Sequence, residues 1–301
     1  MKAKNILLIG VGWFGKNHLK VWRALEKRGS ARLVGIVEKD ERTRRELREE
    51  QSIPVFAAVR APLLKRVDAV DIVTPTPTHF ALVRKCLRYT NVFVEKPLAE
   101  EAHQARELGE LSVRYKRVLM VGHIFRFHPV TMKLQSFFQK ERERPSLVTG
   151  QFISPLATWK GKTTALDNLH FFDILDFLFC GEPSDIRSSA QEGVLTFRAQ
   201  YPQGMKAEFE LGWRGKEKER LLDFCLPNKE IHCDFKRNII VIQNGQKKRT
   251  IRCQSTVSPL ESELATFLEA VSGTHIEYTD SAVAARIITV ANAADAGAKR
   301  E

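Results

Sequence analysis

Residues 10–15, Gly-Val-Gly-Trp-Phe-Gly, restrict the fold of this 301-residue chain more than any other segment. They follow an apolar run at 4–10 that is typical of a buried strand, and residues 16–28 have helical periodicity. In a strand–turn–helix unit the first glycine of G-x-G-x-x-G allows a tight turn, the second lets a pyrophosphate approach the backbone, and the third lets the helix pack closely. The helix start then offers free N–H groups to phosphates. The segment therefore predicts a dinucleotide site at Gly10, Gly12 and Gly15.

An acidic residue follows the next expected strand. Residues 32–37 form this apolar run, and Glu38 stands directly after it. At this distance from the glycines, a carboxylate binds the ribose 2′-hydroxyl of NAD and repels the 2′-phosphate of NADP. The sequence therefore favours NAD, while Lys39 and Arg42 nearby leave NADP possible.

Short apolar runs alternate with helix-like stretches over the first 122 residues. The expected strands are 4–10, 32–37, 54–56, 69–73, 91–94 and 118–121, and the expected helices are 16–28, 40–51, 79–89 and 101–115, the third with Thr78 as its N-cap. Six strands that alternate with helices predict an α/β domain with a doubly wound parallel sheet of the Rossmann type. We assign residues 1–122 to this NAD(P)-binding domain.

After Gly122 the hydrophobic period falls to two. Three pairs of alternating runs are each separated by a turn, 195–201 with 205–213, 221–226 with 231–235, and 239–242 with 249–253. Asn244-Gly245 in the last turn is a strong hairpin signal. Helices are expected at 130–140, 167–179, 260–271 and 281–298. Residues 123–301 are therefore predicted to form an α+β domain with a mainly antiparallel sheet, for substrate binding and oligomerisation.

Composition narrows the class of protein. The hydrophobic share of 43% suits a soluble globular chain, and no run approaches the ~20 apolar residues of a membrane span. Five scattered cysteines favour reduced thiols and argue against a zinc site. The net charge of +12 is interleaved with acidic residues, which favours attraction to a small anion, and no nucleic-acid-reading motif accompanies it. We expect a cytoplasmic protein with no metal, no nucleic-acid partner and no membrane partner.

The tripeptide Glu95-Lys96-Pro97 follows the apolar run 91–94. A lysine at the carboxyl end of a parallel strand lies where open α/β sheets bind ligands. Pro97 restricts the backbone of Lys96, and a cis bond between the two is a hypothesis where a side chain must be aimed. From the residues alone, a solvated strand end is the alternative interpretation.

Five segments occur in the order found in one oxidoreductase family. They are 10–15, 74–79, 95–97, 122–129 and His170-Phe171-Phe172-Asp173. On these segments the chain resembles the glucose–fructose oxidoreductase / inositol dehydrogenase (Gfo/Idh/MocA) family over nearly its whole length. The resemblance implies NAD(P)-dependent oxidation or reduction of a hydroxyl carbon on a sugar, cyclitol or nucleotide sugar. It also implies a homodimer or homotetramer that assembles through the C-terminal sheet. The cofactor contacts that it implies are Trp13, Phe14, Thr74, Pro75, His79, Glu95 and Lys96. For Trp13 and Phe14, the alternative is packing on the first helix. For His79, the alternative is an ordinary polar residue in the first turn of a helix.

The resemblance assigns the proton chemistry to Lys96 and His170. Removing a hydroxyl proton needs a positioned base or a cation beside the alkoxide. The ordinary pKa of a lysine, ~10.4, must be lowered for this task, whereas a histidine titrates near neutrality. Family members usually carry an acid four residues before the histidine, where this chain has Leu166. We predict that Asp167, three residues before His170 and on the same helix face, takes that role.

Two further charged residues are substrate-binding candidates. Arg126 either clamps an acidic substrate or forms an ion pair between the domains. Asp173 contacts substrate, pairs with a basic neighbour or lies on a solvated helix face. Trp159 and Lys160 precede the expected helix, where a loop could close over substrate. The sequence therefore predicts a dehydrogenase. The missing acid at Leu166 motivates the alternative, a regulatory protein that keeps the fold and the cofactor without catalysis.

Overall fold

The computed structural model describes residues 3–158 and 164–298, which form two compact units. The first unit contains Met1–His123 and Leu260–Ala285, and the second contains Ile124–Pro259 and Arg286–Glu301. The sequence had placed residues 260–285 in the second domain. The structure differs because Phe267 packs edge-on against Phe93 at 5.6 Å, and the Val121 N–H donates to the carbonyl of Thr279 at 2.8 Å. The apolar face of helix 260–271 predicts burial, but nothing local says against which sheet.

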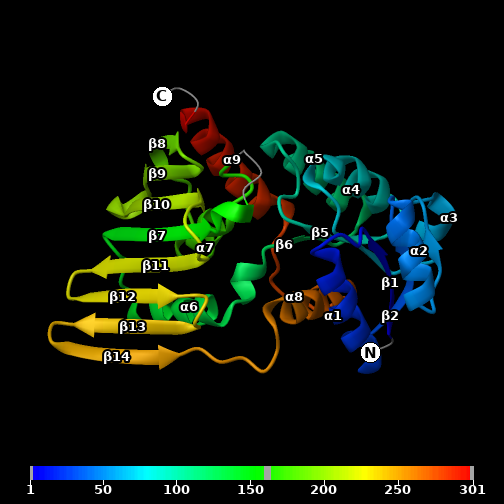
Figure 1. The fold of residues 1–301 in the computed structure, drawn as a ribbon, viewed down its shortest axis with the longest axis horizontal. Coiled ribbons are helices and arrows are strands. Elements are labelled where there is room, and N and C mark those ends of the chain that lie inside the picture. The colour runs from blue at the N-terminus through cyan, green and yellow to red at the C-terminus, as the bar shows by residue number, and fades with distance from the viewer. Residues whose placement is uncertain (1–2, 159–163, 299–301) are drawn as a thin grey trace. The chain divides into compact units, whose positions relative to one another are not determined.

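The first unit is built on a six-stranded parallel sheet (Figure 1). Its strands are β1 (Lys4–Ile9), β2 (Ala31–Val37), β3 (Val55–Phe56), β4 (Ala69–Ile72), β5 (Asn91–Glu95) and β6 (Leu119–Gly122). Their order is β3-β2-β1-β4-β5-β6, and each neighbouring pair is parallel. This order reverses direction beside β1, so the ends of β1 and β4 border the crevice where doubly wound sheets bind dinucleotides. The predicted doubly wound sheet is confirmed.

Helices cover both faces of this sheet. They are α1 (Gly15–Lys27), α2 (Glu41–Glu50), α3 (Ala61–Leu64), α4 (His79–Leu87), α5 (Ala102–Tyr115) and α8 (Pro259–Val271), with a 3-10 turn η1 (Thr76–Thr78) before α4. Phe93 of β5 packs against His18 of α1 and Phe267 of α8, so α1 and α8 share one face. Figure 1 shows α4 and α5 together on the other face. The short helix α3 was not predicted.

The second unit contains an eight-stranded sheet in the order β14-β13-β12-β11-β7-β10-β9-β8. Its strands are β7 (Leu147–Ser154), β8 (Ser184–Gln191), β9 (Val194–Gln200), β10 (Lys206–Trp213), β11 (Glu219–Leu226), β12 (Lys229–Asp234), β13 (Ile239–Asn244) and β14 (Lys247–Arg252). Only β7 and β10 pair in parallel; every other neighbouring pair is antiparallel. The mainly antiparallel sheet is confirmed, although β7 and β8 were not predicted.

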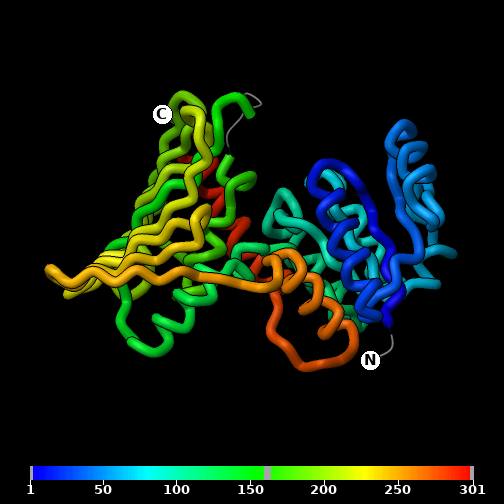
Figure 2. The backbone as a smooth tube through the Cα atoms, turned by 60° about the horizontal axis from the view of Figure 1, so that its bottom comes forward, coloured from blue at the N-terminus to red at the C-terminus, as the bar shows by residue number. Residues whose placement is uncertain are grey.

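The helices of the second unit lie on one face of this sheet, as Figure 2 shows. They are α6 (Pro129–Glu141), α7 (His170–Phe179) and α9 (Ser281–Ala298), which belongs to this unit from Arg286 on, with 3-10 turns η2 (Ile124–Phe127), η3 (Leu156–Thr158) and η4 (Pro202–Gly204). Phe171 of α7 stacks on Phe209 of β10, and Phe138 of α6 packs edge-on or tilted against Phe179 and Phe224. Aromatic packing between helices and sheet therefore holds α7 in place. None of the described helices is long and apolar enough to cross a membrane.

Candidate active site

The three glycines of the first loop have three different surroundings. Gly10 has a φ of +92°, and a Cβ there would lie 2.7 Å from the carbonyl oxygen of Val73. A Cβ on Gly15 would collide with the carbonyl of Gly10, whereas a Cβ on Gly12 would meet no atom within 4 Å. Gly10 and Gly15 are therefore required by the turn and by helix packing. The open space above Gly12 fits a pyrophosphate that approaches the backbone.

The start of α1 is also suited to an anion. No side chain caps the helix, and no acidic residue stands in its first turn. The partial positive charge of a helix N-terminus therefore stays uncompensated by this chain's own side chains there. Together with the glycines, this surface fits the diphosphate of a dinucleotide.

Glu38 lies at the end of β2 beside the glycine loop. Its Oε2 accepts the Val11 N–H at 2.8 Å, and its Oε1 accepts the Asp40 N–H at 2.9 Å. Each carboxylate oxygen can accept a second hydrogen bond, so the group fits the predicted ribose contact. Arg42, which left NADP possible, pairs with Glu46 at 3.1 Å, and Lys39 is exposed.

Trp13 and Phe14 differ in environment. The Trp13 side chain is exposed, at 86% of its full area, and stacks on Phe14 with ring centroids 6.1 Å apart. Phe14 packs edge-on against His18 of α1 at 5.1 Å. The packing alternative therefore describes Phe14, whereas Trp13 presents most of its ring to solvent.

The 74–79 loop is fixed by side-chain bonds to its own backbone. Thr78 Oγ1 donates to the carbonyl of Pro75 and lies 2.7 Å from Thr74 Oγ1. Thr78 stands at the N-cap position of α4, as predicted, but its side chain makes no capping bond, because its hydroxyl closes the loop instead. His79 is buried, and its Nδ1 and Nε2 lie 2.7 Å from the carbonyl oxygens of Pro97 and Thr74. Both ring nitrogens are thus occupied by backbone, which favours a structural role over the predicted cofactor contact.

Lys96 is half-buried directly after β5. The bond between Lys96 and Pro97 is cis, as hypothesised. Glu95 is buried, its Oε1 lies 3.1 Å from His18 Nε2, and its Oε2 accepts the Lys96 N–H at 3.2 Å. The interpretation of Glu95 as a cofactor contact stays a prediction, but its carboxylate is engaged within the first unit.

His170 is the first residue of α7 in the second unit. Its ring lies 4.6 Å from that of Phe125, which also packs against His128 and Phe235. Burial lowers the pKa of His128 to about 4, despite a backbone hydrogen bond to Phe235 that raises it. His170 therefore lies against an aromatic cluster that contains a His128 kept neutral by burial. Its predicted meeting with Lys96 stays a prediction.

Asp167 does not lie on the helix that was predicted for it. The helix begins at His170, and residues 165–169 form turns. Thr164 Oγ1 donates to Asp167 Oδ2 at 2.5 Å, and the Asp167 N–H donates back to Thr164 Oγ1 at 3.1 Å. This local bonding competes with helix formation and explains the later start. The assignment of Asp167 to the missing acid's role therefore loses its helix-face argument and stays a proposal. Trp159 and Lys160 lie outside the described residues.

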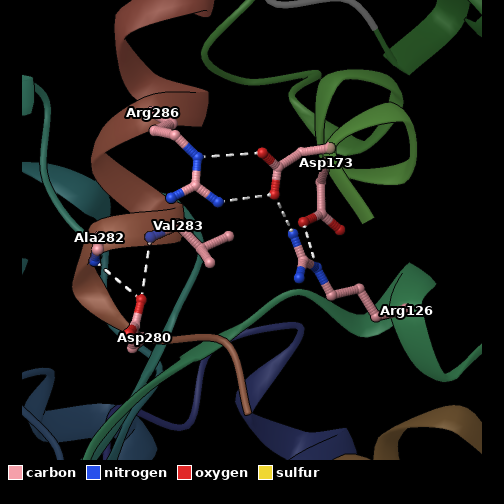
Figure 3. Close-up of polar contacts among 7 residues, drawn as sticks. Arg126, Asp173, Asp280, Ala282, Val283 and Arg286 are labelled. Carbon is pink, nitrogen blue, oxygen red and sulfur yellow. Dashed lines mark hydrogen bonds and ion pairs between the residues drawn. The ribbon is translucent and has the colours of Figure 1, made fainter. Parts of the chain in front are cut away.

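Arg126 and Asp173 contact each other (Figure 3). Arg126 Nε donates to Asp173 Oδ1 at 2.6 Å, and its Nη2 donates to Asp176 Oδ2 at 3.0 Å. Arg286 of α9 holds the same Asp176 through two bonds of 3.1 and 3.2 Å. Asp173 is fully buried, so the structure favours its pairing with a basic neighbour over substrate contact. The ion pairs of Arg126 lie within the second unit, so they differ from the pair between the domains that was the alternative for this residue. Asp176 and Arg286 were missed because a pairing over 110 residues leaves no local signal.

The parallel sheet and glycine loop define the class: a protein with a dinucleotide-binding Rossmann unit and a second unit built on a mainly antiparallel sheet. Residues 4–123 match the sequence model of an oxidoreductase family with an NAD-binding Rossmann fold, Gfo/Idh/MocA. This match covers the N-terminal part of the chain and supports the resemblance to the same NAD-binding oxidoreductase family.

Curated relatives share part of their length with this chain. UDP-N-acetylglucosamine 3-dehydrogenase of Acidithiobacillus ferrooxidans is 29% identical over 187 residues, which is 60% of this chain and 56% of that protein. Inositol 2-dehydrogenase of Rubrobacter xylanophilus is 38% identical over 105 residues, 33% of this chain and 29% of that protein. The chain thus spans about half or less of the length of these relatives.

Solved structures share the fold over the whole chain. A structure of the Acidithiobacillus UDP-N-acetylglucosamine 3-dehydrogenase has a TM-score of 0.89 at 23% identity, covering 100% of this chain and 99% of that one. An Agrobacterium radiobacter oxidoreductase, solved with NAD+, L-tartaric acid and magnesium, has a TM-score of 0.87 at 16% identity, with 98% and 96% covered. At these identities the likeness shows the fold.

Proposed function

We propose that this chain is an NAD-dependent dehydrogenase that transfers a hydride between nicotinamide and a secondary hydroxyl carbon of a sugar, cyclitol or nucleotide sugar. The observation that carries the proposal is Lys96. It stands half-buried at the carboxyl end of β5, in the same parallel sheet whose first loop has a glycine arrangement suited to a pyrophosphate. Ligands of doubly wound sheets bind at this edge.

The chain's own residues must handle a proton. A bound nicotinamide supplies the hydride acceptor for oxidation or the hydride donor for reduction. For oxidation, the neutral amine of Lys96 takes the hydroxyl proton while the carbon loses its hydride, which leaves a ketone and an ammonium. His170 is the second proton carrier, and it passes that proton onward or holds the substrate hydroxyl. In reduction the same groups return the proton to the oxygen.

We favour NAD over NADP because Glu38 is held in place by two backbone N–H groups at the end of β2. A fixed carboxylate there repels a 2′-phosphate. Arg42, one of the two nearby cations that could offset this repulsion, forms a surface pair with Glu46, and the other, Lys39, is exposed.

An anionic nucleotide sugar is the substrate class that we favour. The net charge of +12 attracts anions, and the relative with the 187-residue match acts, by its name, on UDP-N-acetylglucosamine. A free cyclitol is the competing class, because other relatives are named inositol 2-dehydrogenases. We also propose a homodimer or homotetramer that assembles through the sheet face that the described helices of the second unit leave uncovered. Light scattering on the purified chain tests this assembly.

The test measures the change in absorbance of the reduced nicotinamide during turnover. UDP-N-acetylglucosamine, myo-inositol and free sugars are each assayed with NAD and with NADP. We expect turnover with NAD and a nucleotide sugar. Lys96→Ala should lose at least about 100-fold in kcat, the usual scale of general acid–base catalysis, while dinucleotide affinity stays within about threefold. The matched control is Lys20→Ala, an exposed lysine of α1. Undiminished turnover by Lys96→Ala would refute its role.

A second candidate function rests on Leu166, which stands where relatives usually carry an acid. Asp167 beside it is exposed and bonded to Thr164. A regulatory protein that binds dinucleotide and sugar without turnover fits this arrangement. Calorimetric binding of both ligands with no absorbance change across the whole panel would favour this candidate over the dehydrogenase.

A further inference from the structure

The residues on both sides of Lys96 are each held by a buried histidine. His18 of α1 contacts the carboxylate of Glu95 at 3.1 Å, and His79 of α4 contacts the carbonyl of Pro97 at 2.7 Å. Both histidines lie at most 1% exposed. They come from two different segments, one directly after the glycine loop and one directly after the 74–78 loop.

His18 connects Glu95 to the centre of the sheet. Its Nδ1 lies 2.8 Å from Asp71 Oδ2 on β4, and Trp22 Nε1 donates to the same oxygen at 2.6 Å. The ring thus stands between two carboxylates, which only accept, so both of its nitrogens carry protons. Burial lowers the pKa of His18, but the charges and hydrogen bonds of Asp71 and Glu95 outweigh it and raise the pKa to about 10. At neutral pH an imidazolium therefore fixes the Glu95 carboxylate to α1.

The Glu95 carboxylate in turn reaches Lys96. Its second oxygen accepts the Lys96 N–H at 3.2 Å. The Glu95 carboxylate therefore connects the imidazole of His18 to the backbone of Lys96. A Cβ on Gly122 would lie only 2.8 Å from the other oxygen of this carboxylate, Glu95 Oε1. Gly122 thus leaves room for the carboxylate in this position.

His79 holds the other side of the turn. Its two ring nitrogens lie 2.7 Å from the Pro97 and Thr74 carbonyl oxygens. Burial lowers the pKa of His79, so at neutral pH the ring carries one N–H and donates to one of the two carbonyls at a time. Thr74 follows β4 by two residues, and its hydroxyl bonds Thr78 within the same loop. The 74–78 loop and the Lys96 turn therefore both contact one buried imidazole.

We propose that His18 and His79 are positioning residues for Lys96. They tie the Lys96 turn to the glycine-loop helix and to the 74–78 loop, so that the amine keeps a constant position relative to the dinucleotide surface. Neither residue needs to touch substrate or cofactor for this. The proposal rests on the proposed function, because it assumes that Lys96 acts on a substrate aligned by these loops.

The kinetic test compares His79→Ala and His18→Gln with wild type. A displacement of a reacting group by about 1 Å costs on the order of 100-fold in rate, so we expect kcat to fall about 30- to 100-fold. The dissociation constant of NAD, titrated by fluorescence, should change less than about threefold. His79→Gln keeps one amide donor for the Pro97 carbonyl and should recover part of the lost kcat. His103→Ala, an exposed histidine on α5, is the matched control. Equal losses in kcat and NAD affinity, or no rescue by glutamine, would contradict the proposal.

A second measurement does not depend on turnover. Reductive methylation with 13C labels lysine amines, and Lys96→Arg assigns the Lys96 signal in the NMR spectrum. We expect this signal to shift in His18→Gln and His79→Gln and to stay in place in His103→Ala. An unmoved Lys96 signal in both folded variants would overturn the proposal. If wild type turns over no substrate, the proposed function fails, and this spectrum alone decides the positioning.

Discussion

Replacing Arg126 by methionine should destabilise the second unit strongly. The change removes the cation that contacts Asp173 and Asp176, whose side chains are 0% and 9% exposed. Breaking a buried pair by removing one partner costs about 3–5 kcal/mol, because a charge is left buried without compensation. Asp176 keeps Arg286, so the lower end of that range, about 3 kcal/mol, is the expected loss. The pKa of Arg126 is raised by these two carboxylates although burial lowers it, so the guanidinium is charged throughout the working pH range.

Calorimetry and urea titration measure this loss. For a domain of this size each kcal/mol lowers Tm by roughly 2–4 °C, so the second unit should melt about 6–12 °C earlier. Adding Asp173→Asn to the variant removes the stranded charge and should restore at least about 1.5 kcal/mol in a double-mutant cycle. Arg187→Met is the control, because Arg187 and its partner Asp185 are 77% and 64% exposed and such pairs contribute at most about 1 kcal/mol. A loss below about 1 kcal/mol for Arg126→Met would refute the reasoning.

The remaining predictions concern the two glycines Gly10 and Gly12 and the pH dependence of stability that His18 and His128 cause. Gly10→Ala should lower the free energy of unfolding by at least about 1–2 kcal/mol, because it forces a side chain to a φ of +92° against a carbonyl. Gly12→Ala should leave stability within about 0.5 kcal/mol yet weaken NAD binding tenfold or more, about 1.4 kcal/mol; thermal melts and calorimetric titration distinguish the two. The folded pKa of His18, about 10, lies above its unfolded value of ~6.5, so its stabilisation is complete below pH 6.5 and is lost as pH rises toward 10. The folded pKa of His128, about 4, lies below that value, so its stabilisation is complete above pH 6.5 and is lost as pH falls toward 4. Urea titrations of His18→Gln and His128→Asn across this range should each lack the corresponding slope, and an unchanged slope would count against the assignment.

Local chemistry made the first unit predictable. A glycine that must adopt positive φ, a strand that ends there and a helix that begins there all lie within a few residues of Gly10. The parallel strands are buried and have continuous apolar sequences, so each could be recognised without knowing which strands it pairs with. The turn at Lys96 was found for the same reason, because it directly follows β5.

Long-range packing explains why β7 was not predicted, and a local side-chain bond explains why the start of α7 was placed too early. Gly150 interrupts the alternation within β7, and a Cβ there would meet Phe171 at 2.6 Å and a Leu222 methyl carbon at 2.7 Å. A residue that looks like a strand breaker in sequence is therefore the one that lets α7 approach the sheet. The edge strand β8 is polar and carries a register shift between Ser184 and Arg187, so it has no hydrophobic pattern to recognise. Thr164 bonds to Asp167 and turns the chain before His170. Hydrophobic periodicity does not indicate such a bond, so Asp167 was predicted to lie on the helix.

The contacts of Asp176 tie α7 to two other segments of the second unit. The chain enters the second unit at Ile124 and again at Arg286. Arg126 lies two residues after the first entry and Arg286 is the second entry itself, and both donate to the carboxylate of Asp176. One side chain of α7 therefore fixes both entry points to the helix that begins with His170. The N-terminus of α9 is fixed separately, since Asp280 accepts the N–H groups of Ala282 and Val283 (Figure 3). A change at Asp176 should consequently loosen the contact of both entry points with the helix that begins with His170.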